Sequence, residues 1–405
     1  MNPRGSGLRS RLGGGIFALA GAAGLWRALA EDTHGHYRMF MGAAGNLWAG
    51  AQAYDVPYLG NLYFYSPTCA LYFFGPLSRL PETAGLALYL LLSIAVFATG
   101  GWILARTFLS RPQLQCLAFL IAPHFYAAIA AHKLELLVCG LAFWATAWLV
   151  QGRRLVASAL LYAVAVNFKL QPLPAAALMS LVLLMTRDRR RSWMIYGGVF
   201  LALLSALPYL ARPAAEITRA YGQWSESLNR YSRQSFDFYD NVFAFLANDF
   251  GLHLSYGQAQ ALGALCAAVL AAGLAFRVRR GRNAGLIIGL GFGFAYTTLF
   301  SPLQQINATL LFAPVYALAL ALRGRVAGRD AEASRRSATR WSAAIATTWA
   351  VLALGYSDLI PQTLRPLLRH AAIRPLACLL LTVAVAIALC IKPRDLTVEV
   401  AAAGT

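Results

Sequence analysis

Long apolar runs, separated by short basic segments, constrain this chain more than any other feature. Runs of about 17 to 25 apolar residues can cross the hydrocarbon core of a bilayer as helices. Such runs occur at 13–30, 84–105, 113–130, 134–151, 193–211, 256–276, 284–300, 303–322, 341–359 and 373–391. The region 154–186 is longer than one span, and we expect its prolines to divide it into two shorter helices that meet at Lys169–Pro174.

The composition agrees with these runs, because 59% of the 405 residues are hydrophobic and only 13% are charged. A chain this apolar cannot bury all of its runs in one water-soluble core. The sequence therefore predicts an all-α polytopic membrane protein, a single domain over residues 1–405 with about twelve transmembrane helices.

Basic residues gather in short segments on one predicted side of the membrane. They lie at 4–11, 106–111, 153–154, 187–191, 277–282, 323–340 and 392–394. By the positive-inside rule this side is cytoplasmic, so both termini are predicted to be cytoplasmic. The net charge of +19 then reflects topology rather than nucleic-acid binding, because no basic domain accompanies it. The alternative for the N-terminus is a signal peptide that ends at Ala28–Ala30.

Two long segments, 31–82 and 212–255, are predicted to face the opposite, extracytoplasmic side. Both mix aromatic with polar residues, and 36–51, 214–230 and 239–250 have helical periodicity, which predicts amphipathic helices lying in the interface. We expect the two segments to cover a polar cavity that is open to lipid. The residues 323–340 are predicted to form a basic cytoplasmic loop.

The first outer segment begins with two acids, Glu31 and Asp32, directly after an apolar run. A carboxylate there can act as general base on a hydroxyl group, while lysine or arginine neutralises the phosphate of a leaving group. Because nucleotides are not available outside the cytoplasm, glycosyl transfer on that side must draw on an activated lipid. This chemistry explains why acids would stand where the membrane ends.

Cysteine and histidine give little sign of a metal site. The six cysteines are scattered without CxxC spacing, so neither a zinc site nor a disulfide framework is expected. His34 and His36 stand two residues apart beside Asp32, and the alternative there is a bound divalent ion. We expect no metal and no cofactor.

The first outer segment also carries motifs in a fixed order: Asp32, Tyr37, Ala43–Ala44, Gly50, Ala53–Asp55, Tyr63–Pro67 and Pro76–Pro81. Further on come Asn167–Pro174, with a Lys-x-x-Pro pattern, and the Ser-Pro turn of Ser301–Asn307. Over residues 25–320 this set resembles the multi-spanning GT-C glycosyltransferases. Within them it resembles glycosyltransferase family 87, which includes polyprenyl-phosphate-mannose-dependent α-1,2-mannosyltransferases. The chain departs from the family pattern at His132–Glu135 and at Asn307.

The resemblance implies a GT-C bundle in the bacterial cytoplasmic membrane with its active site on the extracytoplasmic face. It implies inverting transfer of a sugar, mannose as the first choice, from a polyprenyl-phosphate donor to a lipid-linked or glycan acceptor. Asp32 would be the catalytic base. Glu31 is the alternative base, and a carboxylate that is merely hydrated at the interface is the simpler interpretation of Asp32.

Other polar residues are candidates for holding the substrates. The candidates for the donor phosphate are Lys169, Arg219, Arg230 and Arg233, although lysine can also snorkel and arginine can lie solvated on a surface helix. The candidates for binding sugar or acceptor are Glu31, His36, Tyr37, Tyr65, Lys133, Glu135, Gln171, Asp240, Asn241, Gln304, Gln305 and Asn307. Lys133 and Glu135 are alternatively expected to pair with each other, and packing or hydration explains any single one of the rest.

Two other functions fit many spans and a polar cavity. A lipid or glycolipid transporter is the main rival, but transporters place ionisable groups near the bilayer midplane, whereas these groups cluster at one surface. A scaffold whose outer loops bind a partner protein would tolerate single carboxylate substitutions. The sequence favours the glycosyltransferase.

Overall fold

The chain forms a bundle of helices, described here from a computed structural model. The structure describes residues 4–31, 35–58, 62–235, 241–278, 282–301, 310–324, 331–354 and 373–391. Within this part of the chain, six helical segments are long and apolar enough to cross a membrane, and other apolar helices are shorter. The all-helical class is therefore confirmed, whereas the prediction of about twelve spans stays a prediction.

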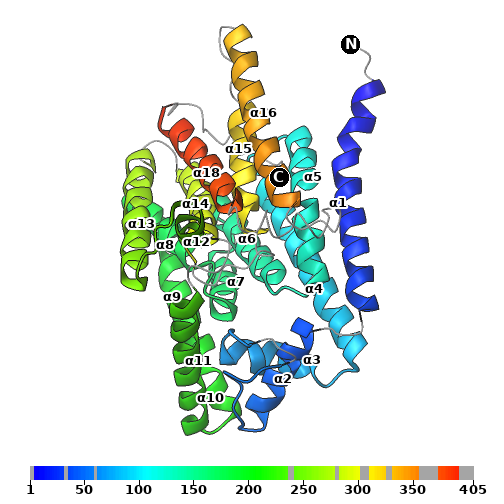
Figure 1. Ribbon diagram of the computed structural model, residues 1–405, viewed down its shortest axis with the longest axis vertical. Coiled ribbons are helices and arrows are strands. Elements are labelled where there is room, and N and C mark those ends of the chain that lie inside the picture. Colours follow the sequence, from blue (N-terminus) through cyan, green and yellow to red (C-terminus); the bar gives the residue numbers. More distant parts are fainter. Residues whose placement is uncertain are drawn as a thin grey trace.

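The predicted apolar runs coincide with helices. The six long ones lie in α1 (Arg4–Ala30), α4 (Glu82–Ala105), α5 (Arg111–Ala130), α9 (Ser192–Ala206) with α10 (Pro208–Ala211), α13 (Tyr256–Val278) and α14 (Arg282–Phe300). The shorter apolar helices include α6 (Glu135–Gln151), α15 (Ala313–Gly324) and α18 (Ile373–Ile391). Figure 1 shows α1, α4 and α5 side by side along one edge of the bundle.

The break in the region 154–186 lies where the prolines predict it. Helix α7 (Leu155–Phe168) ends one residue before Lys169, and α8 (Leu173–Met185) begins with Pro174 at its second position. Proline suits the first turn of a helix, because the amide that it lacks would have no intrahelical partner. The Tyr162 hydroxyl donates to the Pro172 carbonyl at 3.0 Å and ties the connection to α7.

Glycine brings α4 and α6 into backbone contact. A Cβ atom built on Gly140 of α6 would lie 2.6 Å from the Phe97 amide nitrogen of α4, and one on Gly100 would lie 2.4 Å from the Gly140 carbonyl oxygen. Small residues allow such close approach between helices in a membrane. The helices α4 and α6 are therefore closely packed against each other.

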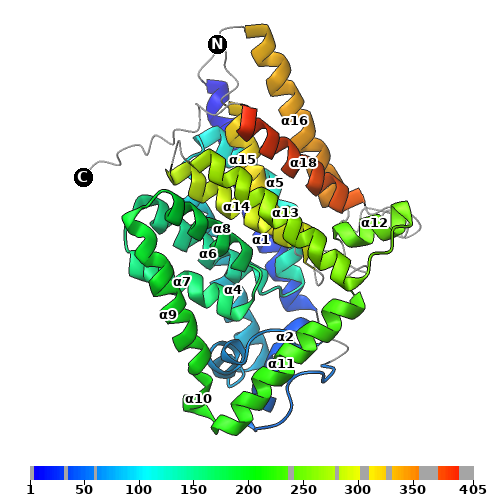
Figure 2. The same ribbon diagram turned by 90° about the vertical axis from the view of Figure 1, so that its left-hand side faces the viewer.

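Helices from the two predicted outer segments gather at the end of the bundle opposite the N-terminus (Figures 1 and 2). They are α2 (Gly35–Trp48), η1 (Cys69–Phe74), α3 (Gly75–Leu77) and α11 (Ala214–Ser235), and α10, the end of the predicted span 193–211, contacts η1 and α11 there. Trp224 of α11 donates to the Phe64 carbonyl at 2.9 Å, and Arg230 of α11 forms an ion pair with Asp55. Helices are present at the predicted stretches 36–51 and 214–230, and the two segments contact each other. Their extracytoplasmic, interfacial position stays a prediction.

Helix α12 (Val242–Phe250) lies within the third predicted stretch, 239–250, but it does not join this group. It packs against α14 and α18, farther along the bundle (Figure 2). Asn241 precedes it, and its side-chain oxygen accepts a hydrogen bond from the Ala244 amide at 2.9 Å.

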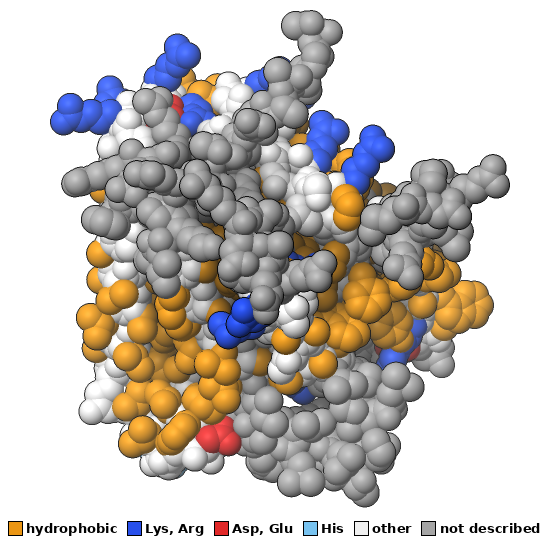
Figure 3. Space-filling view, turned by 90° about the horizontal axis from the view of Figure 1, so that it is seen from above, with side chains coloured by type: hydrophobic (Ala, Val, Ile, Leu, Met, Phe, Trp, Pro, Cys, Tyr) orange, Lys and Arg blue, Asp and Glu red, His pale blue; other side chains and the backbone are white. Residues whose placement is uncertain are grey.

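The predicted basic loop 323–340 is wrong in its extent. Helix α16 (Ala331–Leu354) begins well before residue 340, so the second half of the basic segment is helical. Alanine, glutamate and arginine in this stretch have high helix propensity, which outweighs its polarity. Figure 1 shows α16 projecting at the end where the N-terminus lies, and lysine and arginine side chains project from the same face (Figure 3).

Candidate functional site

A tight turn between α5 and α6 buries two opposite charges close together. The turn runs through His132, whose φ is +51°, and the Lys133 amide donates back to the Ala128 carbonyl at 2.9 Å. Lys133 is 3% exposed, and Glu135, the first residue of α6, is 1% exposed. Lysine and glutamate are almost never buried this fully without partners. The residues around Lys133 and Glu135 therefore form a candidate functional site.

Lys133 is held against His36 of α2. Its Nζ lies 2.9 Å from His36 Nε2, and an ammonium group has only protons to give, so Nε2 accepts and His36 is neutral. Burial, followed by the nearby Lys133 charge, lowers the pKa of His36 to about 3, which agrees with a neutral ring. Burial also lowers the pKa of Lys133 to about 8, although Glu135 acts in the opposite direction.

Lys169 reaches the same place from the break between α7 and α8. Its backbone is extended directly after α7, and its Nζ donates to Glu135 Oε1 at 2.6 Å. The same ammonium lies 5.1 Å from the ring centre of Tyr65, within the range of a cation–π contact. The Lys169 side chain is 22% exposed, whereas the Glu135 side chain is 2% exposed.

We call His36, Lys133, Glu135 and Lys169 the lysine–glutamate cluster. The cluster brings two lysine side chains and one buried carboxylate together. A phosphate has several acceptor oxygens, and it forms short charge-assisted hydrogen bonds with ammonium groups. The arrangement is therefore suited to binding a phosphate.

Aromatic side chains from the first loop segment and from α4 form a packed group that reaches the cluster through Tyr65 and Tyr89. The ring of Phe40 stacks on Phe74 at 4.2 Å and meets Tyr65 and Tyr89 edge-on at 5.1 and 6.0 Å. Tyr89 donates to the His132 carbonyl at 3.1 Å and so fixes the turn that carries Lys133. Burial raises the pKa of Tyr65 well above its usual value, so its ring stays neutral beside Lys169.

The structure brings together five of the predicted site residues: His36, Tyr65, Lys133, Glu135 and Lys169. The expectation that Lys133 and Glu135 pair with each other is not met, because the ion pair of Glu135 is with Lys169. Residues two apart at a helix start point in different directions, so their nearness in sequence does not make them partners. Sequence reasoning missed the His36 contact, since nothing in the chain links positions 97 apart.

Other predicted residues lie elsewhere or serve the fold. Glu31 pairs with Arg27 at 3.1 Å on α1, and Asn241 caps α12. Tyr37 is buried between α2 and α4, and Gln171 offers its carbonyl to Thr297 at 2.8 Å. Asp32, His34, Asp240, Gln304, Gln305 and Asn307 lie outside the described residues.

The predicted phosphate-binding arginines of α11 differ from one another. Arg230 contacts Asp55, which also accepts from Ser227 at 3.0 Å. Arg233 contacts Asn229 at 3.1 Å and lies over the ring of Tyr256, and Arg219 is exposed. Among the described residues, none of these three forms a hydrogen bond or ion pair with the lysine–glutamate cluster, so Lys169 stands apart from them.

The sequence of this chain matches a known protein family. The family model described as glycosyltransferase family 87 matches residues 63–302, which is more than half of the chain. The chain belongs to glycosyltransferase family 87. No curated protein and no solved structure matches it.

As a family 87 member, the protein is a glycosyltransferase, and the matched range contains three of the four cluster residues: Lys133, Glu135 and Lys169. His36 and Asp32 precede it, because the match begins at Tyr63. The buried charges thus belong to the part of the chain that carries the family likeness.

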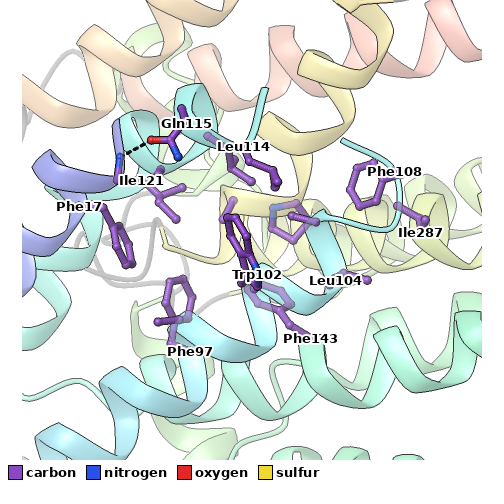
Figure 4. A pocket seen from close by; sticks show the side chains of 18 of the residues that line it. Phe17, Phe97, Trp102, Leu104, Phe108, Leu114, Gln115, Ile121, Phe143 and Ile287 are labelled. Carbon is purple, nitrogen blue, oxygen red and sulfur yellow. Dashed lines mark hydrogen bonds between the residues drawn. The ribbon is translucent and has the colours of Figure 1, made fainter. Parts of the chain in front are cut away.

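An apolar cavity of about 170 Å³ lies elsewhere in this family 87 bundle, between α1, α4, α5, α6, α14 and α15 (Figure 4). Phe17, Phe97, Trp102 and Phe143 are among its lining residues. The polar side chain of Gln115 is already engaged, because its Oε1 accepts from the Gly14 amide at 2.6 Å. The cavity offers no charged group to a phosphate, so the lysine–glutamate cluster is the better candidate for the chemical site.

Proposed function

We propose that this enzyme transfers a sugar, mannose as the first choice, from a polyprenyl-phosphate donor to a lipid-linked or glycan acceptor. The reaction would take place at the extracytoplasmic face of the bacterial cytoplasmic membrane, with both termini in the cytoplasm. The lysine–glutamate cluster is the observation that carries the proposal. Two lysines beside one buried carboxylate suit a leaving group that carries phosphate, and the apolar helices suit a lipid that carries it.

The proposed step forms one bond and breaks one. The acceptor oxygen attacks the anomeric carbon of the donor sugar from the face opposite the phosphate, and the bond from that carbon to the phosphate oxygen breaks. The configuration inverts, and polyprenyl monophosphate leaves with one more negative charge than it had as a diester. Asp32 would take the proton of the acceptor hydroxyl, as the resemblance implies.

Lys133 and Lys169 would stabilise the charge that grows on the leaving phosphate. Such groups accelerate a reaction because they bind the transition state more strongly than the ground state. The neutral His36 fixes Lys133, and Glu135 fixes Lys169, so neither ammonium must reorganise during the step. In this proposal Arg219, Arg230 and Arg233 would meet the donor as it approaches along α11.

The test is transfer of radiolabelled sugar from polyprenyl-phosphate mannose, and from a panel of other polyprenyl-phosphate sugars, to an extracted lipid pool. Asp32→Asn is expected to lower kcat by at least about 100-fold, as loss of a general base does. Glu226→Gln is the matched control, because Glu226 is an exposed carboxylate on α11 with a 74% exposed side chain. Equal transfer by the parent and Asp32→Asn would refute the role of Asp32.

A different failure would point to the rival function. If no donor in the panel supports transfer, flipping of a labelled polyprenyl-phosphate sugar across vesicles becomes the next measurement. Flipping by the parent protein in the absence of any transfer would identify a transporter and overturn the proposed reaction.

A further inference from the structure

Burying the Glu135 carboxylate costs more free energy than a partially exposed partner for Lys169 would cost. Its side chain is 2% exposed, and its Oε2 has no hydrogen-bond partner among the described residues. A buried acceptor without a partner is unfavourable. Lys169 could keep its ammonium hydrated without this carboxylate, because its side chain is 22% exposed and lysine can extend its ammonium toward water. A role beyond neutralising Lys169 would account for the carboxylate.

The charges of donor and product suggest that role. A polyprenyl-phosphate sugar is a phosphodiester with a charge of about −1, whereas the released polyprenyl monophosphate carries about −1.5 to −2 at neutral pH. Two lysines alone would therefore bind the product more tightly than the donor. An enzyme that does not release its product cannot turn over. The site therefore needs a negative charge that lowers the affinity of its lysines for the product.

We infer that Glu135 limits the affinity of the lysine–glutamate cluster for polyprenyl monophosphate, so that the leaving group is released after transfer. The inference rests on the proposed function, since it takes the cluster as the phosphate site. Glu135 does not touch the reacting atoms. It acts through Lys169, and through its charge on Lys133, and is a positioning residue.

The expected size of the effect comes from Coulomb's law. A phosphate oxygen bound to Lys169 would lie about 5 Å from the Glu135 carboxylate, because the ammonium stands between them at hydrogen-bond distance from each. With an effective dielectric of about 20, the extra half to one unit of charge on the monophosphate changes affinity by about 15- to 250-fold. Removing the Glu135 charge should strengthen product binding by that factor relative to diester binding.

The experiment compares two lipids with the same tail and different charge. Polyprenyl monophosphate and its methyl diester are titrated against the purified full-length protein at pH 7, and the ratio of their dissociation constants is measured. Uncharged polyprenol measures what the tail contributes. The inference predicts that Glu135→Gln raises the preference for the monophosphate over the diester at least about tenfold, whereas Glu135→Asp, which keeps the charge, leaves it near the parental value.

A second variant guards against misfolding of Glu135→Gln. Lys169→Gln keeps the carboxylate and removes one positive charge, so it should shift the preference toward the diester by a similar factor. An unchanged ratio in both folded variants would overturn the role of Glu135 while leaving the proposed phosphate site intact. If instead the parent binds polyprenol as tightly as both phosphates, the cluster is not a phosphate site, and the proposed function loses its main support.

Discussion

The pKa of Lys133 makes a prediction about the rate of transfer at alkaline pH. Burial lowers this pKa to about 8, so the ammonium that would meet the phosphate is present at pH 7 and largely lost at pH 9. For a single titrating group the charged fraction falls from about nine-tenths to about one-tenth over that interval. The donor is a phosphodiester and does not titrate there. We therefore expect kcat/KM, which reports the free enzyme, to fall about tenfold between pH 7 and 9.

Loss of folding does not explain such a fall, because the linkage has the opposite sign. The pKa of Lys133 in the folded protein, about 8, lies below its ordinary value of 10.5. The unfolded chain therefore binds more protons between these values, and the contribution of Lys133 to the free energy of unfolding increases as pH rises through that window. Thermal unfolding in detergent at pH 7 and 9 separates this contribution from the activity.

The assay is the pH profile of kcat/KM for sugar transfer from pH 6 to 10, for the parent and for Lys133→Arg. Arginine stays charged over this range, so the variant should lose the descending limb centred near pH 8. A parental profile that stays flat to pH 10 would refute the reasoning. So would an identical descending limb in a folded Lys133→Arg variant, because the limb would then belong to another group.

Two further predictions concern the contact between α4 and α6 and the ion pair between Asp55 and Arg230. Gly140→Ala places a Cβ 2.6 Å from the Phe97 amide nitrogen, so α4 and α6 must separate by about 1 Å. This separation should cost about 1–3 kcal/mol of stability and lower the Tm. The control Gly198→Ala, with no atom within 4 Å, should hold or raise Tm, and equal Tm values for the two variants would contradict the close contact. Asp55→Asn weakens the ion pair with Arg230, whose side chain is 42% exposed, so the free energy of unfolding should change by less than about 1 kcal/mol. Hydrogen exchange of the α11 amides should become faster. Unchanged exchange would contradict the role of this ion pair in holding α11.

The fold could be predicted where local physics decides it. Apolar run length predicted the helices, and the prolines at 172 and 174 predicted the break that presents Lys169. The charge of the basic segment after Arg323 predicts a loop, yet the helix propensity of its residues favours α16, which begins at Ala331.

The candidate site could be predicted only in its members, not in its pairings. His36, Lys133, Glu135 and Lys169 all stood out as polar groups near the predicted outer face. Their partners depend on which helices pack together, and that information is spread over the whole chain. The pairing of Glu135 with Lys169, 34 residues away, instead of Lys133 shows how packing overrides nearness in sequence.

The turn between α5 and α6 makes the site sensitive to the length of the chain as well as to its residues. Lys133 and Glu135 flank a single residue, and the turn is closed by the bond from Lys133 to Ala128. Each residue added to or removed from a helix rotates the later residues by about 100° about its axis. One inserted or deleted residue here would turn Glu135 away from Lys169 while leaving every side chain of the cluster present. In this family 87 chain, the spacing of the turn should tolerate insertions and deletions less than its intervening residue tolerates substitution.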